Sequence, residues 1–158
     1  MKLRHSHAIL LSALVWMGIG TLLLIKGLQY LTLMGNKVLS GTHQGFSLIQ
    51  QAGRLTSHSE QGAMIVVVAA LLLGFFKGRI ILKKTVHRTV SRIKSHPSPV
   101  PITSIYSKGY LFLIGGMMCL GFIFKILPLP LDVKGFIDLT IGVALTNGGM
   151  LYIRALFA

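Results

Sequence analysis

Acidic residues are nearly absent from this chain, which has only Glu60, Asp132 and Asp138 among 158 residues. Sixteen Lys and Arg residues leave a formal net charge of +13, yet charged residues make up only 12% of the chain. A soluble domain has about 25% charged residues. The deficit argues against a water-soluble protein. The charge excess indicates a polyanionic partner, which in so hydrophobic a chain we expect to be anionic lipid.

Signatures of catalysis and of metal binding are also missing. Cys119 is the single cysteine, so the chain can form no intramolecular disulfide and has no zinc-binding spacing. The sequence contains no P-loop, no dinucleotide fingerprint and no Ser-His-Asp or Cys-His pattern, and its six histidines are scattered. We therefore predict no enzyme activity, no catalytic residue, no metal site and no cofactor.

The chain instead contains long hydrophobic stretches. Hydrophobic residues make up 53% of it, and four apolar stretches cover residues 8–30, 62–82, 108–129 and 135–157. Each has the roughly 20 residues that a helix needs to cross a hydrocarbon core of about 30 Å. The first is longer than a signal peptide's apolar region and lacks an A-x-A cleavage site, so we interpret it as a retained span. The pattern predicts an all-α, integral membrane four-helix bundle.

The distribution of basic residues predicts an orientation. If the four stretches all cross, eleven of the sixteen Lys and Arg residues fall on the side of the two termini, and all three acids fall on the other. By the positive-inside rule, both termini are cytoplasmic. The expected location is a bacterial inner (plasma) membrane.

A basic segment follows the second stretch without any acid. Its cations are Lys77, Arg79, Lys83, Lys84, Arg88, Arg92 and Lys94. Leu82, Val86, Val90 and Ile93 recur at steps of four, four and three residues, which predicts a juxtamembrane helix lying at the headgroup level. The cations serve either as a stop-transfer and orientation signal or as a site for anionic headgroups. Nucleic acid is not expected, because no aromatic residues alternate with the basic ones.

Three regions follow from these features. Residues 1–94 form a first transmembrane hairpin that ends in the basic helix, 95–107 a Pro-rich cytoplasmic linker, and 108–158 a second hairpin. The outer loop of the first hairpin, 32–61, is either functional or simply solvated. A short helix from about Gly41 would place Phe46, Ile49 and Leu55 on one apolar edge.

Small residues at helical spacing predict where helices touch. Ala70, Gly74 and Gly78 lie four apart in the second stretch, and Gly142 and Gly149 lie in the fourth. Small side chains let helix backbones approach closely within a membrane. These residues predict a compact bundle or a homo-oligomer, and the sequence does not distinguish the two.

Polar residues within the fourth stretch are the remaining candidates for function. Asp138 lies near its outer end, where it either pairs locally with Lys134 or across the bundle with Lys26 or Lys125, or handles an ion or a proton. Thr146 and Asn147 lie near its middle, where such groups either bond to a helix or line a solute path. If Asp138, Thr146 and Asn147 form a continuous polar seam, transport is favoured; if each is satisfied locally, it is not.

The leading prediction is a non-catalytic membrane component that binds lipids, particularly anionic ones, or a membrane-protein partner. The alternative is a small oligomeric channel or transporter for an ion or a small solute.

Overall fold

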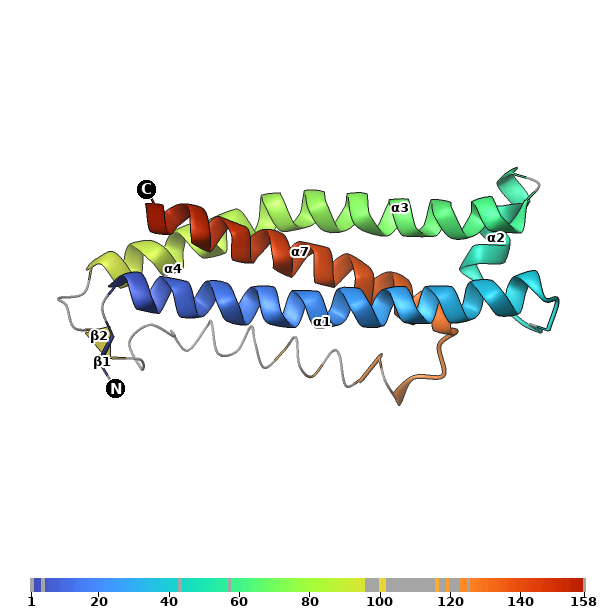
Figure 1. The fold of residues 1–158 in the computed structure, drawn as a ribbon, viewed down its shortest axis with the longest axis horizontal. Coiled ribbons are helices and arrows are strands. Elements are labelled where there is room, and N and C mark those ends of the chain that lie inside the picture. The colour runs from blue at the N-terminus through green and yellow to red at the C-terminus, as the bar shows by residue number, and fades with distance from the viewer. Residues whose placement is uncertain are drawn as a thin grey trace.

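The structure is a computed structural model that describes residues 2–3, 5–42, 44–56, 58–95, 100–101, 116, 119, 123–124 and 126–157. Elements are labelled as in Figure 1. The helices are α1 (His5–Leu39), α2 (Leu48–Thr56), α3 (Ser59–Lys77), the π-helix η1 (Gly78–Leu82), α4 (Lys83–Ser95) and α7 (Leu131–Phe157). Two-residue strands, β1 (Lys2–Leu3) and β2 (Val100–Pro101), pair antiparallel with Lys2 opposite Pro101. The predicted all-helical class is confirmed.

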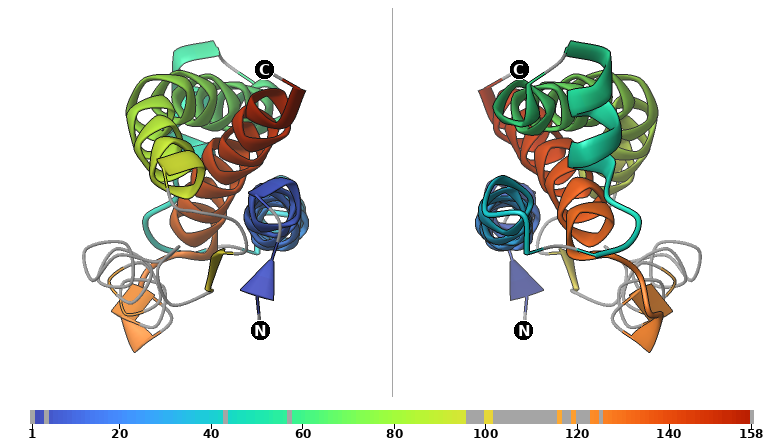
Figure 2. Two further views of the ribbon diagram at one scale, coloured as in Figure 1. Left: turned by 90° about the vertical axis from the view of Figure 1, so that its left-hand side faces the viewer. Right: turned by 90° about the vertical axis from the view of Figure 1, so that its right-hand side faces the viewer.

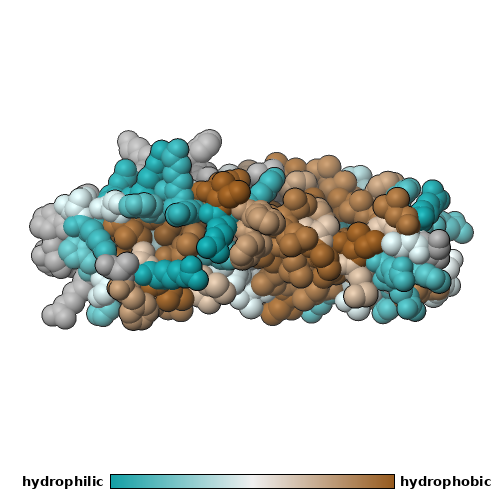
Figure 3. Space-filling view, turned by 90° about the horizontal axis from the view of Figure 1, so that it is seen from above, coloured by the Kyte–Doolittle hydropathy of each residue, from teal (hydrophilic) through white to brown (hydrophobic). Residues whose placement is uncertain are grey.

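Among the residues that the structure describes, three helical segments are long and apolar enough to cross a membrane: His5–Leu39, Glu60–Ser95 and Leu131–Phe157. The second is continuous through α3, η1 and α4. Figure 3 shows hydrophilic side chains gathered at the two ends of one face, with a broad hydrophobic band between them. Most of the predicted span 108–129 and of the predicted linker 95–107 lies outside the described residues.

Helices α1 and α7 pack antiparallel along a seam of glycines. A Cβ atom added at Gly20 would lie 2.6 Å from Thr146 Oγ1, and one added at Gly27 would lie 2.6 Å from Leu139 N. From the other side, a Cβ atom on Gly142 would lie 2.8 Å from Leu24 N. No side chain larger than hydrogen fits at these positions, so the two backbones approach each other closely.

Helix α3 packs on α7 in the parallel direction. A Cβ atom on Gly74 would lie 2.8 Å from Val143 Cβ, and one on Gly78 would lie 2.8 Å from Ala144 Cα. In Figures 1 and 2, α7 lies between α1 and α3. The glycine seam therefore joins the two predicted hairpins, since α1 belongs to the first and α7 to the second.

Two hydrophobic cores lie toward opposite ends of the bundle. One surrounds Trp16 and Tyr152, whose ring centroids are 5.9 Å apart, and it includes residues of α4. The other contains Ile49 of α2 together with residues of α1, α3 and α7. Both chain ends lie at the α4 end of the molecule (Figure 1). We call this the α4 end and the opposite one the α2 end.

Candidate functional site

The basic segment predicted from the sequence begins at a change of helix type. At Gly78 the helix widens into the π-helix η1, and the Gly78 N–H points at the carbonyls of both Gly74 and Phe75. Short π-helical insertions change the direction of a helix and the register of its side chains. Beyond η1, α4 lies toward the start of α1 and the end of α7 (Figure 1).

The apolar face of α4 has the periodicity that the sequence indicates, but it contacts protein. Leu82, Val86, Val90 and Ile93 are all buried, Ile93 completely, in the core that contains Ala8, Trp16 and Tyr152. Burying such side chains stabilises a fold by about 1.5–3 kcal/mol each relative to exposure to water. The apolar face of α4 is therefore not inserted among lipids, and the helix is held on the bundle by its own core.

The exposed surface of this segment is cationic. All seven predicted cations are exposed: Lys77, Arg79, Lys83, Lys84, Arg88, Arg92 and Lys94. We call these seven side chains the basic face. The Arg79 guanidinium lies 5.8 Å from the centroid of the Phe75 ring, which orients it along the helix surface. The sequence from Lys77 to Lys94 contains no acid, so nothing within the segment neutralises this charge.

The three residues of the predicted polar seam do not form a continuous path. Thr146 Oγ1 donates to the Gly142 carbonyl at 2.9 Å, and Asn147 Nδ2 donates to the Val143 carbonyl at 3.0 Å. Both bonds are local to α7. Asp138 is partly buried and interacts electrostatically with Lys26. Nine residues separate Asp138 from Asn147, which places them on opposite faces of a helix with about 3.6 residues per turn.

The predicted packing residues all lie at contacts between helices. Ala70 has no exposed surface, Gly74 and Gly78 touch α7, and Gly142 and Gly149 touch α1. Sequence reasoning missed three further glycines of the α1–α7 seam, Gly20, Gly27 and Gly135. The missed signal is a spacing of seven residues, which Gly20 and Gly27 show on α1 and Gly135, Gly142 and Gly149 show on α7.

A buried carboxylate near the α2 end was also missed. Asp132 is completely buried, and its Oδ2 accepts hydrogen bonds from Ser47 Oγ at 2.7 Å and from Ile49 N at 3.3 Å. Its Oδ1 accepts from Val133 N at 2.9 Å. Ser47 Oγ in turn caps α2 by accepting from Gln50 N at 3.2 Å. Asp132 thus fixes α2 to the start of α7.

These contacts correct the predicted outer helix. It begins at Leu48 instead of near Gly41, and only Ile49 of its predicted apolar edge is buried. Phe46 precedes the helix and is 56% exposed, and Leu55 is 84% exposed. The sequence Ser47-Leu48-Ile49-Gln50 has the S-x-x-Q form of a capping box, which would have located the helix start.

Within the part of the chain that the structure describes, no group of three His, Cys, Asp or Glu residues is placed to hold a metal ion. No family model, curated protein or solved structure matches the chain in comparisons with known proteins.

Proposed function

We propose that the chain is a non-catalytic integral membrane protein that binds anionic lipid headgroups through the basic face. The observation that carries the proposal is the division of the α4 segment into two faces. Its apolar side chains are buried in the protein core, while its seven cations are exposed. A helix fixed in this way presents its charges as a preformed surface, and recognition depends on phosphate groups without insertion of the helix among the lipids.

Membrane placement follows from the three apolar helical segments. Because α3 and α7 run in the same direction, α4 lies at one end of the molecule and α7 begins at the other. This supports the fourth predicted crossing, and with it the four-helix arrangement. We place the α4 end and both termini in the cytoplasm of a bacterial cell, because that end carries most of the cations.

The channel or transporter is the less favoured function. Thr146 and Asn147 are satisfied by carbonyls of their own helix, and Thr146 lies against Gly20 in the tightly packed seam between α1 and α7. A solute path needs polar groups that line open space. These contacts support a packed bundle in which the membrane-embedded polar groups have structural roles.

Retention of lipids by the purified protein tests the proposal. The full chain is released from mixed micelles of phosphatidylglycerol and phosphatidylcholine at low salt, and bound lipids are counted by native mass spectrometry. The variant Lys83→Gln/Lys84→Gln/Arg88→Gln/Arg92→Gln removes four cations, each of which contributes about 1 kcal/mol near an anionic surface. We expect phosphatidylglycerol retention to fall at least about tenfold.

The matched control is Lys37→Gln/Arg54→Gln, which neutralises two exposed cations at the α2 end. It should leave phosphatidylglycerol retention within about twofold of the wild type, and added salt should weaken binding by the wild type. Unchanged retention by the fourfold variant would contradict the proposal.

A further inference from the structure

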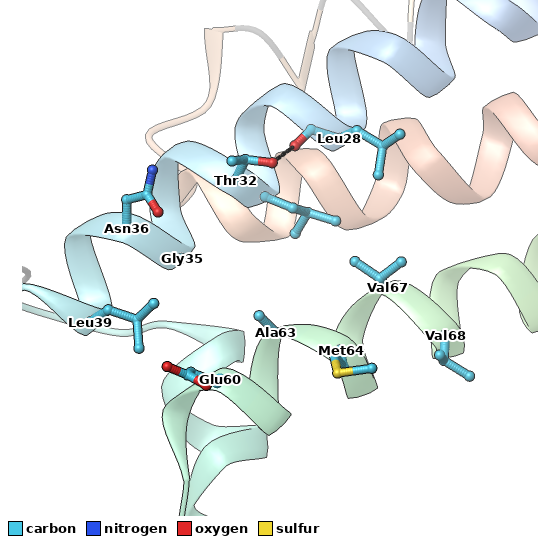
Figure 4. A pocket seen from close by; sticks show the side chains of 11 residues that line it. Leu28, Thr32, Gly35, Asn36, Leu39, Glu60, Ala63, Met64, Val67 and Val68 are labelled. Carbon is cyan, nitrogen blue, oxygen red and sulfur yellow. Dashed lines mark hydrogen bonds between the residues drawn. The ribbon is translucent and has the colours of Figure 1, made fainter.

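A groove lies between α1 and α3 near the α2 end (Figure 4). Its volume is about 450 Å³, within the range of about 300–1,000 Å³ typical of sites for small molecules. The α3 wall extends from Glu60 to Val68, which is about 12 Å along a helix. The α1 wall extends from Leu28 to Leu39.

One of the residues that line the groove is Gly35, and the space beside it is empty. Gly35 is buried, yet a Cβ atom added there would have no heavy atom within 4 Å. The other glycines of α1 behave differently: Gly20 and Gly27 are in tight contact with α7, and Gly18 is exposed on the surface. The side chains of the described residues therefore leave a hollow beside Gly35 unfilled.

The groove is apolar along most of its length and polar at one end. Leu28, Met64 and Val68 line its apolar part, and each is exposed, Met64 at 68%, although all three lie in candidate membrane spans. Thr32 Oγ1 donates to the Leu28 carbonyl at 2.8 Å, so its hydroxyl is satisfied within α1. Among the residues that line the groove, Glu60 is the only charged one, and it lies at the end opposite Val68 (Figure 4).

We infer that this groove binds a membrane phospholipid, with one acyl chain in the groove and an ammonium-bearing headgroup beside Glu60. The inference rests on the membrane placement in the proposed function but concerns the opposite end of the molecule. A hollow in the lipid-facing surface of two spanning helices is filled by hydrocarbon, because lipid is the solvent there. A carboxylate at its mouth favours a headgroup that carries positive charge.

The other acids at this end have partners of their own. Asp132 is buried and accepts three hydrogen bonds, and Asp138 interacts with Lys26. Glu60 is exposed at the start of α3. Glu60 is thus the acid that a bound headgroup can reach. Because its carboxylate favours a positive charge, the proposed ligand carries an ammonium group in addition to its acyl chain.

Filling the groove tests the acyl-chain site. Gly35→Leu places a side chain in empty space on an α-helix, where leucine also has the higher helix propensity. Gly18→Leu is the matched control, because Gly18 has equally open surroundings on the same helix but does not line the groove. Val68→Phe fills the groove from the α3 wall and replaces a side chain that is 49% exposed.

The readout is native mass spectrometry of the full chain, released from micelles that contain phosphatidylethanolamine. We expect Gly35→Leu and Val68→Phe each to lower the retention of this lipid about tenfold, and Gly18→Leu to retain it as the wild type does. If both groove variants hold phosphatidylethanolamine as well as Gly18→Leu does, the groove is not the binding site and the inference is overturned.

The headgroup is tested with diacylglycerol, which has the same acyl chains without the phosphoethanolamine. The wild type should retain phosphatidylethanolamine in preference to diacylglycerol. Glu60→Gln should abolish this preference without lowering the retention of diacylglycerol. If Glu60→Gln still prefers phosphatidylethanolamine, the assignment of an ammonium group beside Glu60 is overturned. The fourfold α4 variant separates this site from the proposed function. It should lose phosphatidylglycerol but keep phosphatidylethanolamine, and if it loses both lipids equally, the groove is not an independent site.

Discussion

At the scale of single residues, the most consequential side chain is Asp132. Its carboxylate is completely buried and accepts from groups 85 and 83 residues earlier in the sequence. Negative charge is also favourable at this position, because Ile49 N and Gln50 N belong to the first turn of α2, where the helix dipole is positive. This one residue links α2, and Ser47 immediately before it, to the start of α7.

Removing that carboxylate should detach α2. Asp132→Ala leaves Ser47 Oγ and Ile49 N without their acceptor, at about 1–3 kcal/mol for each buried group. We expect a lower thermal unfolding midpoint in detergent and faster proteolysis between residues 40 and 58. Asp132→Asn keeps a carbonyl oxygen as an acceptor, so its unfolding midpoint should lie between those of Asp132→Ala and the wild type. Equal midpoints for Asp132→Ala and the wild type would show that the contact contributes no stability.

At the scale of elements, α4 illustrates what a sequence can and cannot reveal. The spacing of Leu82, Val86, Val90 and Ile93 indicated one apolar face correctly, because a helix repeats about every 3.6 residues. Periodicity does not reveal what covers such a face, since lipid and protein are equally apolar. The helix changes direction near η1, beyond which α4 lies on α1 and α7 (Figure 1), and no local feature of the sequence indicates this change.

The α1–α7 seam is the other element-scale feature. A glycine every seven residues keeps an inclined pair of helices in contact, and the sequence reasoning identified Gly142 and Gly149 but not Gly20, Gly27 and Gly135. The contact between Asp132 and Ser47 could not be predicted for a different reason, because no local pattern in one sequence relates residues that far apart.

A single substitution tests the seam. Gly20→Leu would place a side chain against Thr146, where even a Cβ atom would lie 2.6 Å from Oγ1. Overpacking of this kind typically costs about 1–3 kcal/mol or more, so we expect a lower unfolding midpoint in detergent. Gly18→Leu, two residues away in open space, should leave the midpoint unchanged. If Gly20→Leu and Gly18→Leu had the same unfolding midpoint, α1 and α7 would not be in close contact.

At the scale of the whole molecule, the long apolar stretches predicted the membrane class and the helical fold, because such stretches leave a chain few alternatives in water or in lipid. The distribution of basic residues predicted the orientation, and that prediction depends on where the charges lie relative to a bilayer. Placing the α4 end in the cytoplasm and the α2 end outside is the central claim of the proposed topology.

Labelling with a membrane-impermeant maleimide tests that claim most directly. In a Cys119→Ser background, Gln50→Cys places a thiol on an exposed position of α2, and Ser91→Cys places one on an exposed position of α4. We predict that intact cells label Gln50→Cys alone, and that Ser91→Cys reacts only after the membrane is permeabilised. Labelling of Ser91→Cys in intact cells, or recovery of the protein in the aqueous fraction, would contradict the account.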